Sequence, residues 1–341
     1  MLPMKFNTSF IRVCYVKPIF DGVEQVYGFN HRALAIPAPL MNEPMALIPF
    51  TQFALWLSEL ALLTQDPAYI VKLNQQLNFA RLDISGIDLL STPDLAMSIR
   101  RINYGIVSLQ SGASYYVSMS GKIMKWCYKN PYAFKQEKSY DSLRVAIMLL
   151  NALRHFLGDQ YHPIQVRISG CAVAQQETES LFNCPVIWNA AQTEIWLELD
   201  DMLQPLIEPQ LANSSVTMPR SLFEKYLNMP QPHDTPKVLF EMVNYARFYG
   251  LPKIEDIAKL FNISKQQLQR RLQQQGFTFS ALCSYIYNNQ AIKYMLDGKS
   301  VAEISPLLGY ANQQSFSRAF KRLRKCTPQQ YLDTLNQNKP D

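Results

Sequence analysis

The feature that most constrains the fold is a helical pattern that occurs twice in the last third of the chain, offset by 48 residues from Ser264 to Asn312. In the first copy, apolar residues at helical spacing predict a helix over 254–261. Asn262, which tolerates the left-handed conformation of a tight turn, follows, and Ser264 is a good cap for a second helix over 265–275. Helix, short turn and helix in this order predict a helix-turn-helix unit.

The second copy has the same order and stronger signals. Ser300 and Glu303 have the spacing of a capping box, Gly309 supplies the turn, Tyr310 anchors it, and Asn312 caps the following helix. That helix is predicted to face inward with four apolar side chains: Phe316, Ala319, Phe320 and Leu323. A proline before the turn, Pro306, removes one backbone hydrogen bond and can kink the first helix of this copy after its first turn.

A third helix is predicted between the two copies, over residues 280–296. At 1.5 Å per residue it is roughly 25 Å long. Two recognition helices in successive major grooves lie about 34 Å apart, so this connector has the scale that such an arrangement needs.

The outward faces of the two second helices are rich in amides and guanidinium groups. Gln266, Gln269 and Arg270 lie there in the first copy, and Gln313, Gln314 and Arg318 in the second. Glutamine pairs bidentately with adenine and arginine with guanine, so both faces have the chemistry of base recognition. For any one of these side chains, an ordinary solvated helix face is the alternative interpretation.

The charge of the chain is concentrated in the same region. Residues 236–341 hold 15 Lys and Arg against 7 Asp and Glu, a net charge of +8. Residues 1–235 hold 18 and 20, a net of −2. A basic segment next to a nearly neutral remainder favours a polyanion-binding module, although a solvated basic surface would have the same composition.

The stretch from about Val238 to Tyr331 resembles the DNA-binding domain of the AraC/XylS family of bacterial transcription regulators. The resemblance rests on E-I-x-x-x-L-G-Y at Glu303–Tyr310, Q-S-F-S-R-A-F-K-R at Gln314–Arg322, and T-P-x-x-Y at Thr327–Tyr331. The first part of the chain resembles, more loosely, the family's arabinose-binding-type regulatory domain, through IPFTQFALWLSELALLTQDP and HPIQVRISG…LFNCPVIWN. Five positions depart from the family pattern: Ser305 and Pro306 replace small helix formers, Tyr287 and Leu332 replace frequent arginines, and Lys325 replaces a usual glycine.

The resemblance implies a regulator of transcription, expected to be an effector-responsive activator, that reads two successive major grooves of double-stranded DNA. By motif position, the bases are read by Gln266, Gln269, Arg270, Gln313, Gln314 and Arg318. The candidates for contacts with the DNA backbone are Ser264, Arg271, Ser317, Lys321 and Arg322. RNA polymerase is an expected partner and a small-molecule effector a further one, while a homodimer stays open because two motifs per chain already read two groove segments.

The remainder of the chain predicts an α+β regulatory domain over residues 1–205, joined by a linker over 206–236 to the all-α DNA-binding domain over 237–335. Three prolines in 229–237 indicate the linker, and a short helix is expected after Pro219. Within the regulatory domain we expect helices over 49–64, 94–105 and 142–157, a hairpin over 114–128 that turns at Gly121, and strands over 165–169 and 194–199.

The regulatory domain shows no catalytic or phosphate-binding motif, so we expect no enzymatic activity, no cofactor and no metal site. The six cysteines are isolated, which favours free thiols. The aromatic residues Phe53, Trp56, Trp126, Trp188 and Trp196 form either an apolar ligand cavity or plain core, and the ligand-binding residues stay unknown.

Two rival functions stay open. One is a DNA-repair or other cysteine-dependent enzyme with an AraC-like module, and the other is a protein-interaction module. No apolar run has the length of a membrane span and the N-terminus has no signal-peptide pattern, so we expect a cytoplasmic protein without membrane partners.

Overall fold

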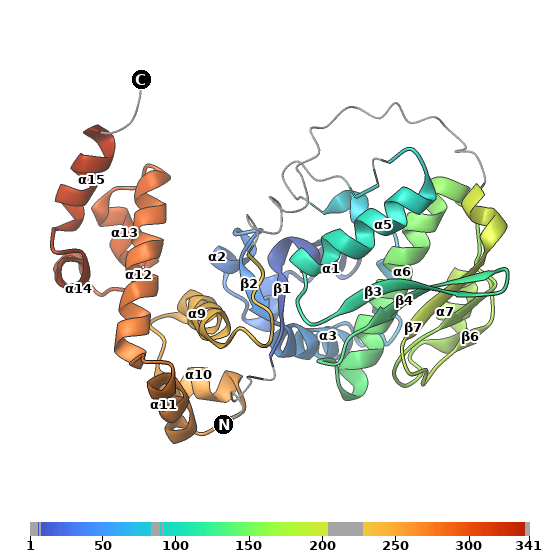
Figure 1. Ribbon diagram of the computed structural model, residues 1–341, viewed down its shortest axis with the longest axis horizontal. Coiled ribbons are helices and arrows are strands. Elements are labelled where there is room, and N and C mark those ends of the chain that lie inside the picture. The colour runs from blue at the N-terminus through green and yellow to red at the C-terminus, as the bar shows by residue number, and fades with distance from the viewer. Residues whose placement is uncertain (1–5, 7, 83–88, 91, 204–227, 338–341) are drawn as a thin grey trace. The chain divides into compact units, whose positions relative to one another are not determined.

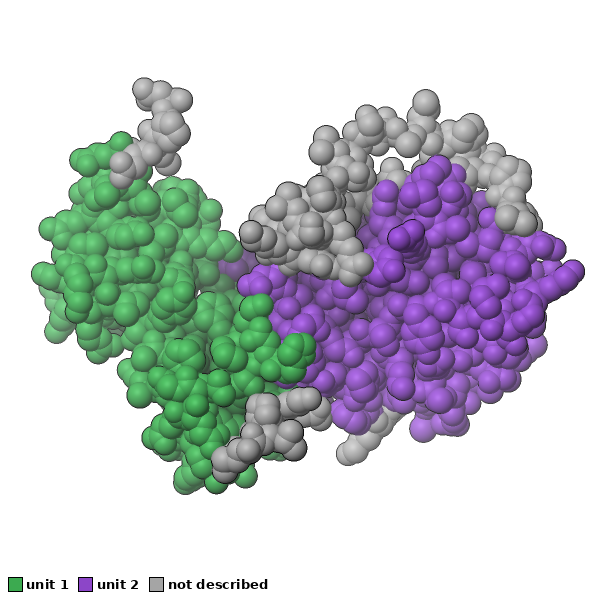
Figure 2. Space-filling model, viewed as in Figure 1, with its two compact units in different colours: residues 1–6, 233–341 green, residues 7–232 purple. Residues whose placement is uncertain are grey.

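The structure is a computed structural model of the 341-residue chain that describes residues 6, 8–82, 89–90, 92–203 and 228–337 (Figure 1). The chain divides into two compact units, residues 7–232 and residues 1–6 with 233–341 (Figure 2). Below, the first is called the N-terminal unit and the second the C-terminal unit. The short helix expected after Pro219 lies outside the described residues.

The N-terminal unit is built around a five-stranded sheet with the order β3-β4-β7-β5-β6. Every neighbouring pair is antiparallel except β5 and β6, which run parallel. Strands β3 and β4 form the hairpin expected from the sequence, with Gly121 in the left-handed region at φ 61°. The strands are β3 (Ser114–Ser120), β4 (Ile123–Lys129), β5 (Gln165–Arg167), β6 (Val186–Ile187) and β7 (Thr193–Glu198).

Helices cover the apolar face of this sheet. The long helix α6 (Lys135–Leu157) packs against β7, and α3 (Phe50–Thr64) packs in turn against α6 (Figure 1). Helix α5 (Leu95–Gly105) lies against β3, and its Asn103 accepts a hydrogen bond of 2.7 Å from the buried Trp126 indole. The further elements are β1 (Phe10–Arg12), α1 (Val13–Tyr27), α2 (Ala38–Met41), β2 (Leu47–Pro49), α4 (Tyr69–Lys72) and α7 (Gln175–Phe182).

A polar network lies buried between α6 and its surroundings. The side chains of Arg144 and Asp141 are both fully buried, and Arg144 Nη2 donates to Asp141 Oδ1 at 2.8 Å. Tyr128 donates its hydroxyl proton to Asp141 at 2.6 Å, and the Arg144 guanidinium stacks 4.6 Å from the centre of the Tyr15 ring. Burial alone would lower the pKa of Arg144, but its neighbours Tyr15 and Asp141 keep that pKa above the ordinary value.

The C-terminal unit is all helical. The two helix-turn-helix units are α10 with α11 and α13 with α14, and α12 joins them. The α+β class of the first unit and the helical class of the second are thereby confirmed. The helices are α9 (Thr235–Ala246), α10 (Ile254–Leu260), α11 (Lys265–Gln274), α12 (Phe279–Leu296), α13 (Val301–Leu307), α14 (Gln313–Arg324) and α15 (Pro328–Gln337).

One side chain expected in the core lies outside it. Leu323, in the last turn of α14, is 40% exposed, so its predicted inward position was wrong. The physical reason is α15: the Tyr331 ring packs 5.6 Å from the Phe320 ring, and that contact covers the end of the core in place of Leu323. Pro306 lies one residue before the end of α13, and the N–H of Leu308 still bonds to the carbonyl of Ile304 at 3.1 Å.

Candidate DNA-binding surface

The first recognition helix, α11, is oriented by its cap and by two leucines. Ser264 accepts a hydrogen bond from the N–H of Gln267, and the Gln267 side chain accepts one from the N–H of Ser264 at 2.9 Å. This reciprocal capping box was not expected from the sequence, which indicated the serine alone. Leu268 and Leu272 are buried one helical turn apart, so the opposite face of α11 is left to solvent. The predicted base-reading residues Gln266, Gln269 and Arg270 are all exposed.

The second recognition helix, α14, is held by aromatic packing. Asn312 caps it by accepting a hydrogen bond of 2.8 Å from the N–H of Ser315. The buried Phe316 and Phe320 anchor its inner face, and the Phe316 ring lies 5.6 Å from the ring of Tyr310 in the preceding turn. As on α11, all three predicted base-reading residues are exposed: Gln313, Gln314 and Arg318.

The residues predicted to contact the DNA backbone differ in whether their side chains already make contacts within the protein. Lys321 is exposed, Ser317 is half-buried, and the Ser264 hydroxyl already serves the cap of α11. Arg322 donates to the Ser284 hydroxyl of α12 at 3.2 Å, and the Arg271 guanidinium lies 4.8 Å from the centre of the Phe6 ring. Both arginines therefore have intramolecular contacts that DNA would have to share or replace.

Phe6 is the residue of the C-terminal unit that sequence reasoning missed. It is almost fully buried, and its ring lies 4.3 Å from the Phe261 ring at the end of α10. No local signal could have indicated this contact, because the two rings are separated by most of the chain.

The charge on both recognition helices has one sign. Neither α11 nor α14 contains an aspartate or a glutamate. Helix α14 holds four cations in its twelve residues: Arg318, Lys321, Arg322 and Arg324. Lys265, at the start of α11, forms an exposed ion pair of 2.6 Å with Glu255 of α10. An acid-free, cationic pair of helices attracts the phosphates of a nucleic acid and repels none of them.

Tyr287 connects the two helix-turn-helix units through α12. Its hydroxyl donates to the carbonyl of Gly250, just before α10, at 3.3 Å, and its ring packs 6.0 Å from the ring of Tyr310 in the second turn. Burial raises the pKa of Tyr287, so this hydroxyl stays protonated. Arg324 of α14 adds a second link by donating to Asn289 of α12 at 2.7 Å. Tyr287, which stands where the family pattern has an arginine, therefore contacts both helix-turn-helix units.

The aromatic residues considered for an effector cavity lie in different environments. Phe53, Trp56 and Trp126 are core residues. Trp196 lies at half-exposure between Lys125 and Arg167, whose cationic groups are 4.2 and 4.5 Å from its ring centre.

Within the described ranges, no group of three or more potential metal ligands occurs. No helix there is both long and apolar enough to cross a membrane.

Comparisons with known proteins give matches over both units. Residues 31–206 match the family model described as the arabinose-binding domain of AraC transcription regulators, and residues 257–334 match a helix-turn-helix domain model. The ornithine utilization regulator of Pseudomonas aeruginosa is 23% identical over 97% of this chain and 98% of its own length. The HTH-type transcriptional activator FapR of Escherichia coli is 29% identical over 25% of this chain and 34% of its own.

Coverage differs among these relatives, and the chain matches only about a third of the length of FapR. Among solved structures, the transcriptional regulator CdpR of Pseudomonas aeruginosa has 15% identity and a TM-score of 0.42, over 94% of this chain and 98% of that one.

Proposed function

Since the chain belongs to the AraC family of transcription regulators, we propose that it binds double-stranded DNA sequence-specifically through α11 and α14 and activates transcription in response to a small molecule. One observation carries the proposal: two capped, acid-free helices each expose glutamines and an arginine, and one glutamine (Gln266 and Gln314) and the arginine (Arg270 and Arg318) lie at the same distance from the cap. This arrangement suits the major groove, where glutamine and arginine recognise adenine and guanine.

We assign a role to each residue from the exposure of its side chain. Arg270 and Arg318 have exposed side chains on the outer faces of their helices, so each is assigned to a guanine in its own half of the site. The neighbouring glutamines are assigned to adenines. Lys321 is the freest of the backbone-contact candidates, and it contributes affinity without specificity. RNA polymerase is the partner through which activation would act, and a homodimer is compatible with this assignment without being required by it.

The enzyme alternative finds no support at the thiols. Burial raises the pKa of Cys127 and of Cys184 to about 11 and that of Cys283 to about 12. A nucleophilic cysteine needs the opposite shift, because the thiolate is the reactive form. We therefore assign no cysteine-dependent reaction to these three thiols.

The test is a selection of bound fragments from random DNA with the purified full chain and two variants, Arg270→Ala and Arg318→Ala. The expected result is a motif with two blocks about one helical turn apart, in which each variant relaxes one block by about 1–3 kcal/mol of discrimination. Lys259→Ala is the matched control, because it removes an exposed charge from α10 outside the recognition helices. Equal preferences for all three variants and the parent would contradict the assignment of the two arginines.

A further inference from the structure

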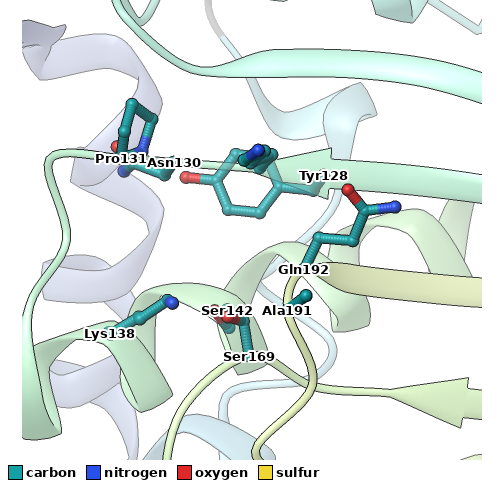
Figure 3. A pocket seen from close by; sticks show the side chains of 9 residues that line it. Tyr128, Asn130, Pro131, Lys138, Ser142, Ser169, Ala191 and Gln192 are labelled. Atoms are coloured by element: carbon teal, nitrogen blue, oxygen red, sulfur yellow. The ribbon is translucent and has the colours of Figure 1, made fainter.

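A cavity at the start of α6 in the N-terminal unit has a different character from the DNA-binding surface. It encloses about 350 Å³ including its opening to solvent, and the end of β4, the first turns of α6 and two loops surround it (Figure 3). Its charged lining residues are Lys129 and Lys138, and no acidic residue of the described ranges lines it. The cavity is therefore a cationic recess.

A glycine allows the cavity wall to approach the helix. Gly170 has a φ of 112°, and a Cβ at this position would lie 2.6 Å from the hydroxyl oxygen of Ser139 and 2.9 Å from its backbone. Only glycine fits such an approach. The contact places the neighbouring Ser169 at the cavity, where its hydroxyl donates to the carbonyl of Ala190 at 2.9 Å.

Most polar groups of the lining are already satisfied. Tyr128 and Asn130 donate to Asp141 at 2.6 and 3.2 Å, which ties this wall to the buried network of Arg144. Gln192 donates from its amide nitrogen to Glu194 at 2.9 Å, and its amide oxygen accepts from the Tyr116 hydroxyl at 2.6 Å. These walls are rigid because their own hydrogen bonds hold them.

Two donors on one face of α6 stay available. Ser142 is 2% exposed and lines the cavity, and no hydrogen bond to its hydroxyl occurs among the described residues. Lys138, four residues earlier, is half-buried and has no ion pair within the described ranges. Residues four apart lie on the same helix face, so the ammonium and the hydroxyl can reach one small ligand.

We infer that this cavity binds the carboxylate of a small organic anion, with Lys138 as its counter-ion and Ser142 as its hydrogen-bond donor. Of the two lining lysines, Lys129 is exposed, so Lys138 supplies the half-buried charge. One half-buried charge and two free donor groups match a singly charged group with two oxygens. Phosphate, with more charge and more oxygens, would leave acceptors without partners. The assignment rests on the proposed function in one respect, because it makes this carboxylate part of the effector.

The test uses the full chain and sodium acetate as the probe. All four tryptophans, Trp56, Trp126, Trp188 and Trp196, lie in the N-terminal unit, so thermal unfolding followed by tryptophan fluorescence reports on that unit alone. Acetate is titrated at constant ionic strength near neutral pH, with sodium chloride as the replacement salt. A ligand that binds only the folded state raises the melting temperature with saturation.

The expected result is a saturable rise with acetate whose midpoint concentration increases about tenfold or more in Lys138→Gln and in Ser142→Ala, because each removes a bond to a charged group. Lys122→Gln, an exposed lysine in the β3–β4 turn, is the matched control and keeps the parent response. No rise beyond that of chloride, or the same response in Lys138→Gln, would overturn the site.

Inorganic phosphate is the second arm, and a stronger response to it than to acetate would overturn the carboxylate assignment. The selection of DNA fragments with Lys138→Gln separates this inference from the proposed function. A parent chain that selects the two-block DNA motif but shows no acetate response would refute the cavity while leaving the DNA-binding proposal intact.

Discussion

Removing the charge of Asp141 is expected to destabilise the N-terminal unit more than any surface substitution. In Asp141→Asn the side chain keeps an oxygen that can accept from Tyr128, but the guanidinium of Arg144 loses its counter-ion. Both side chains of this pair have no solvent exposure, so water cannot replace the lost partner. Breaking a buried ion pair in this way costs about 3–5 kcal/mol.

A double-mutant cycle tests the physical reason. Arg144→Met alone leaves the Asp141 carboxylate buried and is expected to cost about 3–5 kcal/mol as well. The double variant has no buried charge, so its cost falls to the lost hydrogen bonds, about 1–3 kcal/mol. The coupling energy between the two sites is the sum of the single costs minus the cost of the double variant, about 6 kcal/mol at the middle of these ranges.

The assay is urea unfolding followed by tryptophan fluorescence, which again reports on the N-terminal unit alone. Lys17→Gln is the matched control, since its ion pair of 2.6 Å with Asp21 is about half exposed and contributes at most about 1 kcal/mol. Two results would refute the reasoning. One is that each single substitution lowers the unfolding free energy no more than Lys17→Gln does, and the other is that the double variant lowers it by the sum of the two single effects.

Three further outcomes follow from the structure. Gly170→Ala should lower the unfolding free energy of the N-terminal unit by about 1–3 kcal/mol or more, because the positive φ and the Ser139 backbone both oppose a Cβ. Urea unfolding measures this free energy, and an unchanged unfolding midpoint would contradict the close approach of Gly170 to α6. Asn312→Ala should cost the C-terminal unit about 1 kcal/mol through the lost cap of α14, measured by circular dichroism on heating, and no loss would mean that the cap contributes nothing. Iodoacetamide at mildly alkaline pH should label the exposed Cys171 before Cys283, as measured by mass spectrometry of the labelled peptides. Because burial raises the pKa of Cys283 to about 12, labelling of Cys283 should increase only as the pH rises toward that value, and the reverse order of labelling would contradict this prediction.

The C-terminal unit was predictable because its signals are local. A cap such as Asn312 and the N–H that it accepts from are three residues apart, and an anchor such as Phe316 recurs at Phe320 after one turn. Helix boundaries in this unit therefore follow from short stretches of sequence. Leu323 has the same helical spacing, but whether it is buried depends on the packing of α15, which no periodicity within α14 contains.

The N-terminal unit shows where sequence reasoning ends. Helix α1 contains Pro18 and Gly22, which both oppose a helix, and it forms because its apolar residues are buried in the core. The burial of Arg144 and the approach of Gly170 to Ser139 are contacts between distant segments. The candidate carboxylate site depends on the contact between Gly170 and Ser139, so neither its walls nor its free donors could be predicted from the sequence.

Tyr287, which replaces a frequent arginine of the family pattern, contacts both helix-turn-helix units. The 18 residues of α12 span about 27 Å and set the distance between the two helix-turn-helix units, but a helix alone does not fix how each unit is rotated about it. The hydroxyl of Tyr287 holds the loop at Gly250, and its ring holds the turn at Tyr310. Because α11 and α14 can enter successive grooves only in one mutual orientation, a buried residue between them constrains which DNA sites the two proposed recognition helices can occupy together.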